Sequence, residues 1–205
     1  MTPRSRETSE QMRADSRERI LAAARVLFAA RGYHACKVAD IAARSGMSAG
    51  NVYWHFATKE AIRQAILAEG FGAVETMTAD VADEYGPARR KLDLLVDRTL
   101  ALYAEHGDFV VILGGLAGQG GQDLIRSLGF DVPEIERRYR ANLRRVFAEA
   151  RSEAAIAPAD PDLLVAFYLA FFDGLRISAG DLWSTRDRGA IRDAALRLVG
   201  YRSLA

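Results

Sequence analysis

The sequence predicts an all-α fold. Proline occurs only five times in 205 residues, and the long stretches between the prolines are rich in Ala, Leu, Arg and Glu, which favour helices. No stretch alternates apolar and polar residues in the way that indicates a half-buried strand. The length suits one large domain or two small ones, and we expect one domain over residues 1–60 and a second over residues 61–205.

The first expected helix covers residues 15–31. Its apolar residues recur at i, i+4, i+7 and i+8 and form one stripe, which consists of Ile20, Ala24, Leu27 and Phe28. Gly32 follows, and glycine commonly ends a helix because it adopts left-handed backbone angles without strain. Two short helices are expected next, one over residues 38–45 and one that Ser48 caps and that runs to about residue 55.

A tight turn at Gly46 and Met47 is expected between these two short helices. Val52 and Phe56 can close a small core with the first helix, which leaves the other side chains of the second short helix free. The side chains expected to project outward are Ser48, Ala49, Asn51, Tyr53 and His55. A helix that presents short polar side chains at its N-terminal end suits the major groove of DNA.

The remainder also predicts helices, and Thr58 is the expected N-cap of the first of them. The expected helices, several of which open at a proline, cover residues 59–84, 87–105, 109–116, 133–155, 161–180 and 187–201. A glycine-rich stretch, residues 114–121, interrupts this pattern. It is not predicted to bind phosphate, because no strand precedes it and no Gly-Lys-Ser/Thr follows it.

Composition excludes several classes of protein. Residues 1–60 contain ten Lys and Arg against six Asp and Glu, and the rest contains 18 against 21, so a polyanion is expected to meet the N-terminal part. The single cysteine, Cys36, rules out an internal disulfide and a multi-cysteine metal site, and a lone cysteine is more often a small buried hydrophobe than a reactive thiol. No apolar run reaches the roughly 20 residues that span a bilayer. We expect a cytoplasmic protein with no membrane partner, no metal and no cofactor.

One segment carries a specific motif. An Ala-x-x-Leu-Phe-x-x-x-Gly-Tyr helix is followed by an Ile-Ala-x-x-x-Gly turn, a Ser-x-Gly-x-hydrophobic-Tyr-x-His-Phe helix and a Lys-Glu pair. The matching residues are Ala24, Leu27, Phe28, Gly32, Tyr33, Ile41, Ala42, Gly46, Ser48, Gly50, Val52, Tyr53, His55, Phe56, Lys59 and Glu60. This pattern resembles the TetR (tetracycline-repressor-like) family of transcriptional regulators, and it covers about a quarter of the chain.

The resemblance implies a homodimer whose two helix-turn-helix domains bind the half-sites of a palindromic operator in double-stranded DNA. It implies that Tyr53, His55 and Lys59 hold phosphates while Ser48, Ala49 and Asn51 approach bases. Phosphate contacts set the register and base contacts set the sequence, and Asn can bond adenine through two hydrogen bonds.

Three positions depart from the family pattern. Lys37 stands where Thr or Ser is common; it can contact a phosphate but cannot accept a capping hydrogen bond. Ala49 replaces a frequent Lys, which removes one cation from the reading surface. Trp54 replaces a polar residue and is expected to pack on the larger domain or to stack at the DNA backbone.

Two helices of the larger domain are expected to form the dimer interface. The helix over residues 161–180 is apolar on two faces, which indicates burial on both, and the last helix carries one apolar stripe. The residues expected to meet a second copy in a four-helix arrangement are Leu164, Tyr168, Phe172, Leu175, Ile191, Ala195, Leu198 and Val199. The alternative is a monomer that buries both faces itself.

The resemblance also implies an effector pocket inside the larger domain, with an apolar lining and a few polar groups. The candidate lining residues are Phe71, Met77, Thr99, Tyr103, Phe109, Leu113, Tyr139, Asn142 and Phe167. No cluster of His, Asp and Glu suggests a metal effector and no basic patch suggests a phosphorylated one, so a small hydrophobic or aromatic molecule is expected.

The sequence thus predicts a ligand-responsive, dimeric repressor. Ligand binding is expected to favour a dimer geometry whose two DNA-binding domains no longer match successive major grooves. Two alternatives remain. One is an enzyme, although no catalytic constellation appears among three histidines and one cysteine; the other is a helical ligand-binding or architectural dimer with a degenerate DNA-binding domain.

Overall fold

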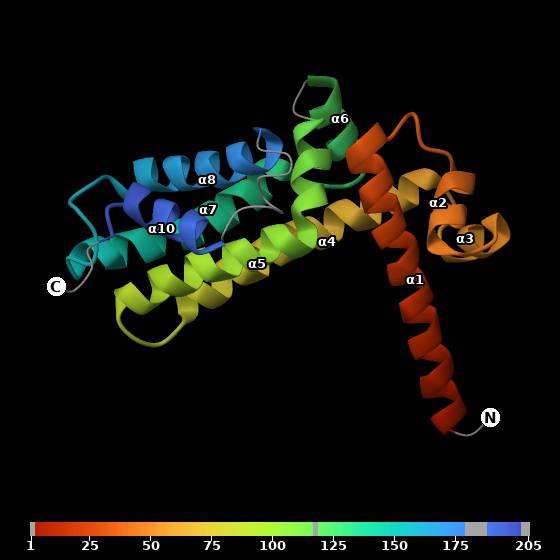
Figure 1. Ribbon diagram of the computed structural model, residues 1–205, viewed down its shortest axis with the longest axis horizontal. Helices are drawn as coiled ribbons and strands as arrows, with labels where there is room; N and C mark the ends of the chain where they lie inside the picture. The colour runs from red at the N-terminus through yellow and green to blue at the C-terminus, as the bar shows by residue number, and fades with distance from the viewer. Residues whose placement is uncertain (1–2, 117–118, 179–187, 202–205) are drawn as a thin grey trace. The chain divides into compact units, whose positions relative to one another are not determined.

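A computed structural model describes residues 3–116, 119–178 and 188–201, and within these ranges the protein consists of nine helices and no strand (Figure 1). The all-α prediction is therefore confirmed. The chain divides into two compact units, residues 1–69, called the head below, and residues 70–205, called the larger unit. No helix within the described ranges is long and apolar enough to cross a bilayer.

Helix α1, Pro3–Arg31, begins about twelve residues before the predicted start. The apolar stripe at Ile20, Ala24 and Leu27 is buried as expected, whereas the described side chains of residues 8–15 are almost all exposed. Hydrophobic periodicity records only the turns of a helix that pack against something, so it could not reveal the exposed first part of α1. The predicted end is confirmed, because Gly32 has a φ of 77°.

The two short helices of the head lie where they were predicted, with α2 over Val38–Ser45 and α3 over Ala49–His55. Gly46 has left-handed backbone angles, with φ 69° and ψ 32°, and ends α2. Ile41 of α2 and Val52 of α3 are both fully buried in the head. The conformation that only glycine adopts cheaply therefore sets the turn between α2 and α3.

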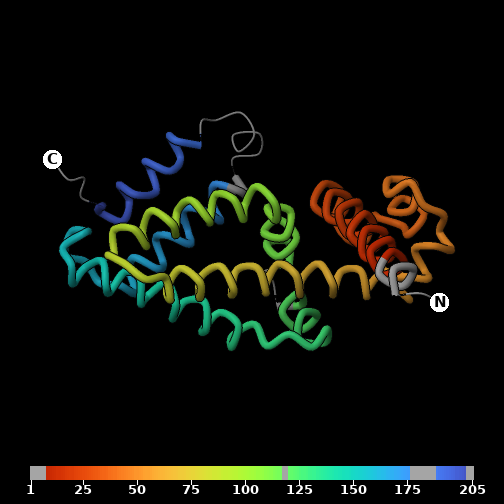
Figure 2. Tube along the Cα trace, turned by 90° about the horizontal axis from the view of Figure 1, so that it is seen from below, coloured from red at the N-terminus to blue at the C-terminus, as the bar shows by residue number. Residues whose placement is uncertain are grey.

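Helix α4, Lys59–Asp83, contains the division between the two units. Thr58 caps it as predicted, because its Oγ1 accepts a hydrogen bond from the Ala61 N–H at 3.0 Å. A turn at Gly86, with φ 131°, then reverses the chain. In the larger unit, α5 runs back alongside the second half of α4 (Figure 2).

The larger unit is a bundle of helices around one core. After α4, its helices are α5 (Ala88–Gly114), α6 (Gln119–Ser127), α7 (Val132–Ser152), α8 (Pro161–Ser178) and α10 (Arg188–Leu198). Helices α5, α7 and α8 pack on one another, and α10 packs on α5 and α8. Phe147 and Phe172 are the largest of the fully buried side chains at their centre.

Two predictions for the larger unit were wrong. The expected helices over residues 87–105 and 109–116 form one helix, α5, which continues through a kink at His106, where φ is −119° and ψ is 17°. The glycine-rich stretch contains the end of α5, but α6 begins inside it at Gln119 and was not predicted. The expected helix ends at residues 180 and 187 lie outside the described residues.

Candidate nucleic-acid interface and ligand cavity

Helix α3 is capped at its N-terminal end and packs on the head through one buried side chain, so most of its other side chains are exposed. The Ser48 Oγ accepts a hydrogen bond from the Asn51 N–H at 3.1 Å, and Val52 is the buried residue of α3. Ala49, Asn51 and Tyr53 are exposed, as their predicted roles require. The Ser48 hydroxyl accepts this hydrogen bond as the cap, and its proton can still be donated to another group.

Lys59 is held by the head itself. Its Nζ donates to the carbonyl oxygens of Tyr33, at 2.9 Å, and Cys36, at 2.8 Å, and lies 4.2 Å from the centre of the Tyr33 ring. The residue was predicted to hold a phosphate, and two of its three N–H donors are occupied by the loop between α1 and α2. Lys59 therefore positions this loop, and one donor is left for any phosphate contact.

A second cation, Arg63, lies on the same aromatic ring. Its guanidinium carbon is 3.8 Å from the Tyr33 ring centre, and its Nη2 donates to Glu60 Oε1 at 3.1 Å. Arg63 is only 2% exposed, and its Nε has no hydrogen-bond partner among the described residues. Burial raises the pKa of the Tyr33 hydroxyl above its ordinary value. Cation–π contact at both Lys59 and Arg63 makes Tyr33 the fixed point of the loop, a role that the sequence reasoning did not assign.

Basic and aromatic side chains gather at the end of α3. Trp54 is 62% exposed; the Arg13 guanidinium lies 5.2 Å from the centre of its ring, and the His55 ring lies edge-on at 4.6 Å. Burial, followed by the charges of Arg17 and Arg13, lowers the pKa of His55. Trp54 thus contacts a cation within the head, which was not predicted, and its stacking at the DNA backbone stays a prediction. His55 lies in a positive field that suits an anion.

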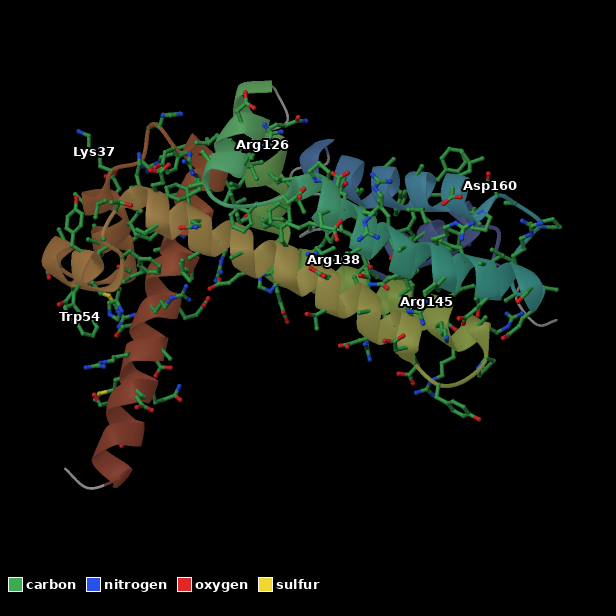
Figure 3. The ribbon with its side chains drawn as sticks, turned by 180° about the vertical axis from the view of Figure 1, so that it is seen from behind. Lys37, Trp54, Arg126, Arg138, Arg145 and Asp160 are labelled. Carbon is green, nitrogen blue, oxygen red and sulfur yellow. The ribbon has the colours of Figure 1, made fainter. Side chains whose placement is uncertain are left out.

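Lys37 extends from the loop before α2 into open space (Figure 3). As predicted, its side chain does not cap α2; instead the Asp40 carboxylate accepts a hydrogen bond from the Lys37 backbone N–H at 2.8 Å. Cys36, next to it, is 1% exposed, donates to the Leu27 carbonyl at 3.3 Å and has a pKa raised by burial. These properties describe a packed thiol rather than a reactive one.

The larger unit contains a cavity of about 300 Å³ between α4, α5, α6, α7 and α8. Five of the predicted lining residues line it, namely Phe71, Tyr103, Phe109, Leu113 and Tyr139. Gly70 also lines it, and a Cβ added at Gly70 would collide with the Phe109 ring. The rings of Phe71 and Phe109 meet edge to face at 5.2 Å, so α4 contributes both bare backbone and an aromatic wall.

The other four predicted residues do not line this cavity, which corrects the sequence-based assignment. Thr99 is buried in the core, where it accepts a hydrogen bond from the Tyr168 hydroxyl at 2.6 Å. Asn142 pairs with Thr78 at 3.5 Å, Met77 lines a separate open groove, and Phe167 is 47% exposed on α8. Polar and aromatic residues of the core and of the cavity look alike in sequence, so the pattern could not separate the two groups.

Acidic and phenolic groups form the polar part of the cavity. The Tyr103 hydroxyl donates to Asp173 Oδ1, and burial raises the pKa of Asp173 above its ordinary value. Burial together with the Glu136 charge raises the pKa of Tyr139 to about 12. Asp173, Glu136 and His106 line the cavity and were not predicted, because single polar residues on apolar helices carry no periodic signal.

The surface expected to form the dimer interface also needs correction. Six of its eight residues are buried inside the chain, namely Leu164, Tyr168, Phe172, Ile191, Ala195 and Val199. Leu175 is half-buried and Leu198 is 42% exposed. Among the described side chains of α8, the exposed apolar residues include Leu163, at 49%, and Phe167, and Ala166 and Ala170 are exposed on the same face. Because α8 is apolar on two faces, the pattern alone did not show which of them points outward, and the buried face was chosen.

Comparison with known proteins agrees with the geometry of the head. Residues 20–66 match the family described as bacterial regulatory proteins, tetR family. The match covers the head, from the buried part of α1 into the first turns of α4.

Solved structures of bacterial transcriptional regulators share the fold. PfmR from Thermus thermophilus is 19% identical, with a TM-score of 0.72 over 90% of this chain and 99% of PfmR. FadR from Bacillus subtilis, solved in complex with stearoyl-CoA, is 22% identical, with a TM-score of 0.64 over 89% of this chain and 97% of FadR. The helix-turn-helix and the helical bundle therefore occur together in these solved structures.

Sequence similarity to a curated relative extends over a shorter stretch. The fatty acid metabolism regulator protein of Bacillus subtilis (strain 168) is 30% identical over 94 residues, which are 45% of this chain and 48% of the relative. The chain thus spans about half the length of this relative in the match.

Proposed function

We propose that this protein is a dimeric transcriptional repressor of the TetR family, which binds a palindromic operator and is released by a small molecule in the cavity of the larger unit. The observation that carries the proposal is α3, a capped, seven-residue helix with one buried side chain, in which Ala49, Asn51 and Tyr53 are exposed. A short polar helix surface of this kind enters the major groove.

In this proposal the side chains of the head divide into two groups. Asn51 forms hydrogen bonds with a base, and the Ala49 methyl packs on a thymine methyl, while the Ser48 proton remains free to be donated. Lys37, Tyr53, His55 and the third N–H of Lys59 contact phosphates, which fixes the register of α3 on the duplex.

Dimerisation is proposed through α8 and α10. Among the described residues, α8 exposes Leu163, Ala166, Phe167 and Ala170, and α10 exposes Leu198. Exposed large apolar side chains on one helix face indicate an interface, and a two-fold dimer places two copies of α3 on successive half-sites. This face replaces the buried residues that the sequence reasoning selected.

Release is proposed to occur by a population shift. A ligand in the cavity contacts α4 at Phe71, and α4 also carries Lys59 and Arg63 at its head end. Such a ligand favours dimer geometries that it binds better, and its differential affinity limits how far repression is relieved. The B. subtilis FadR structure contains stearoyl-CoA; for this chain we propose a smaller effector with an apolar body.

Selection of bound duplexes from a random pool tests the DNA-binding part of the proposal. A two-fold symmetric site is expected. Tyr53→Phe is expected to weaken binding to all selected sequences, whereas Asn51→Ala relaxes the preference at one base pair. Tyr85→Phe, at the exposed turn before α5, is the matched control and is expected to bind like the parent. Failure to select any sequence at moderate salt would overturn the proposal.

Sedimentation analysis tests the dimer surface. Phe167→Glu, on the exposed face of α8, is expected to yield monomers, and Met12→Glu, on the exposed part of α1, is expected to leave the dimer intact. A Phe167→Glu protein that remains dimeric would reject this face as the interface.

A further inference from the structure

The charge of the cavity lining is unbalanced. Two carboxyl groups, Asp173 and Glu136, line the cavity, and no Lys or Arg does so within the described part of the chain. His106 is the lining side chain that can acquire a positive charge, and its Nε2 lies 4.0 Å from the Glu105 carboxylate. The cavity therefore presents negative potential to a ligand.

Asp173 is the carboxylate with unused bonding capacity. Its Oδ1 accepts the Tyr103 hydroxyl, and no described residue donates a hydrogen bond to its Oδ2. The cation that acts on Asp173 is Arg140, which does not line the cavity and lies 3.8 Å from Glu136. A partly desolvated carboxylate with a vacant oxygen is costly on its own and is stabilised by a cation or a strong donor.

Aromatic rings line the same cavity as this carboxylate. Tyr103 and Tyr139 line the cavity beside Asp173, and the Phe71–Phe109 pair forms the wall on α4 and α5. Ring faces attract a cation within about 6 Å, most strongly in a site shielded from water. Carboxylate and rings together form the two kinds of contact that an organic ammonium group needs.

We infer that the effector is a small organic cation, a protonated amine on an apolar or aromatic body, whose N–H bonds Asp173 and whose body packs against Phe71 and Phe109. This inference rests on the proposed role of the cavity as the effector site. A volume of about 300 Å³ equals the share of roughly ten water molecules, which limits the ligand to on the order of ten to fifteen non-hydrogen atoms.

The same lining disfavours an anion. A carboxylate ligand would face two carboxyl groups with no Lys or Arg among the described lining residues to bind it, and like charges at close range repel. The stearoyl-CoA of the B. subtilis FadR structure is an anion with a long chain, so the ligand class of this cavity differs from that one.

Calorimetric titration of the full-length protein without DNA tests the inference with three probes of one scaffold: 3-phenylpropylamine, 3-phenylpropan-1-ol and 3-phenylpropanoate. The amine is expected to bind at least about tenfold more tightly than the alcohol, with the carboxylate weakest. Stearoyl-CoA is the fourth probe and is expected not to bind. Tighter binding of the carboxylate or of stearoyl-CoA, or no binding of the amine, would overturn the inference.

Two variants assign the preference to Asp173. Asp173→Asn is expected to lower amine affinity about tenfold while leaving alcohol affinity nearly unchanged, and Asp162→Asn, an exposed carboxylate on the same helix α8, is the matched control without effect. Tyr103→Phe, which frees Oδ1 and keeps the charge, is expected to retain amine binding and covers the case in which Asp173→Asn does not fold. Unchanged amine binding in Asp173→Asn would reject the assignment.

These outcomes separate the inference from the proposed repressor. If the protein selects a palindromic duplex but binds the carboxylate probe most tightly, the proposed repressor function is supported and the inference of a cationic ligand is rejected. If the protein binds the amine but selects no duplex, the inference of a cationic ligand is supported and the proposed repressor function is rejected.

Discussion

In the head, Lys59 gives two of its three N–H donors to backbone carbonyls and lies against a ring that Arg63 also contacts. In the larger unit, Asp173 keeps one carboxylate oxygen without a described donor, on the wall of a cavity. The head uses its charged groups to fix its own loops, and the larger unit leaves charge available for a molecule that is not part of the chain. The charged groups of the head therefore hold its own structure in place, whereas a charged group of the larger unit remains available to bind a ligand.

The strongest test of this contrast removes the cation that fixes the head. Lys59→Met deletes two charge-assisted hydrogen bonds and is expected to destabilise the head by about 2–4 kcal/mol. Hydrogen exchange of the α2 amides measures the loss. Lys37→Met, an exposed lysine at the start of the same helix, is the control and should leave exchange unchanged; equal protection in both variants would show that Lys59 does not fix the loop.

The turn of the head offers the next effect in size. Gly46→Ala forces a side chain onto left-handed angles and places its Cβ 3.0 Å from Arg19 Nη2, so a loss of about 1–2 kcal/mol in unfolding free energy is expected. Gly72→Ala, on α4 with nothing described within 4 Å of the added Cβ, should instead stabilise the protein by up to about 1 kcal/mol. Urea unfolding distinguishes the two, and a loss in both variants would contradict the expectation.

Two substitutions at Ser48 distinguish its role as the cap of α3 from the role of α3 in binding DNA. Ser48→Ala removes the acceptor for the Asn51 N–H and is expected to cost about 1 kcal/mol of stability. Ser48→Asp keeps an acceptor and should retain the stability, yet it should weaken binding to duplex DNA because its charge opposes the phosphates. If Ser48→Asp binds DNA like the parent, α3 does not approach the duplex with its N-terminal end.

The smallest expected effect is a pH dependence at His55. Its pKa in the folded head is lowered from the ordinary 6.5, so the unfolded chain binds the proton more readily. Stability should therefore be fully present above about pH 6.5 and decline as the pH falls below that value. Thermal unfolding of the parent and of His55→Gln measures the slope, which the variant should reduce; a steeper slope in the variant would reverse the sign.

Local chemistry explains which features the sequence could predict. Gly46, Ser48 and Thr58 determine turns and caps through their own backbone angles and side chains, so α2, α3 and the start of α4 were found within a residue. The outward face of α8 was not found, because Leu164 and Phe167 are both apolar and only the packed bundle shows which one is buried. Thr99 and Asp173 show the same limit for polar residues, since their partners Tyr168 and Tyr103 lie about 70 positions away in the chain.

Gly70 has a consequence for how such a protein can change its ligand over time. The cavity wall at this point is bare backbone against the Phe109 ring, and one added methyl group would press directly on that ring. The room available to a ligand is thus controlled from α4, whereas its charge is read from Asp173 on α8. Residues on different helices thus determine the size and the charge of the ligand. A substitution in a related protein can therefore change the preferred ligand size and leave the preferred ligand charge unchanged.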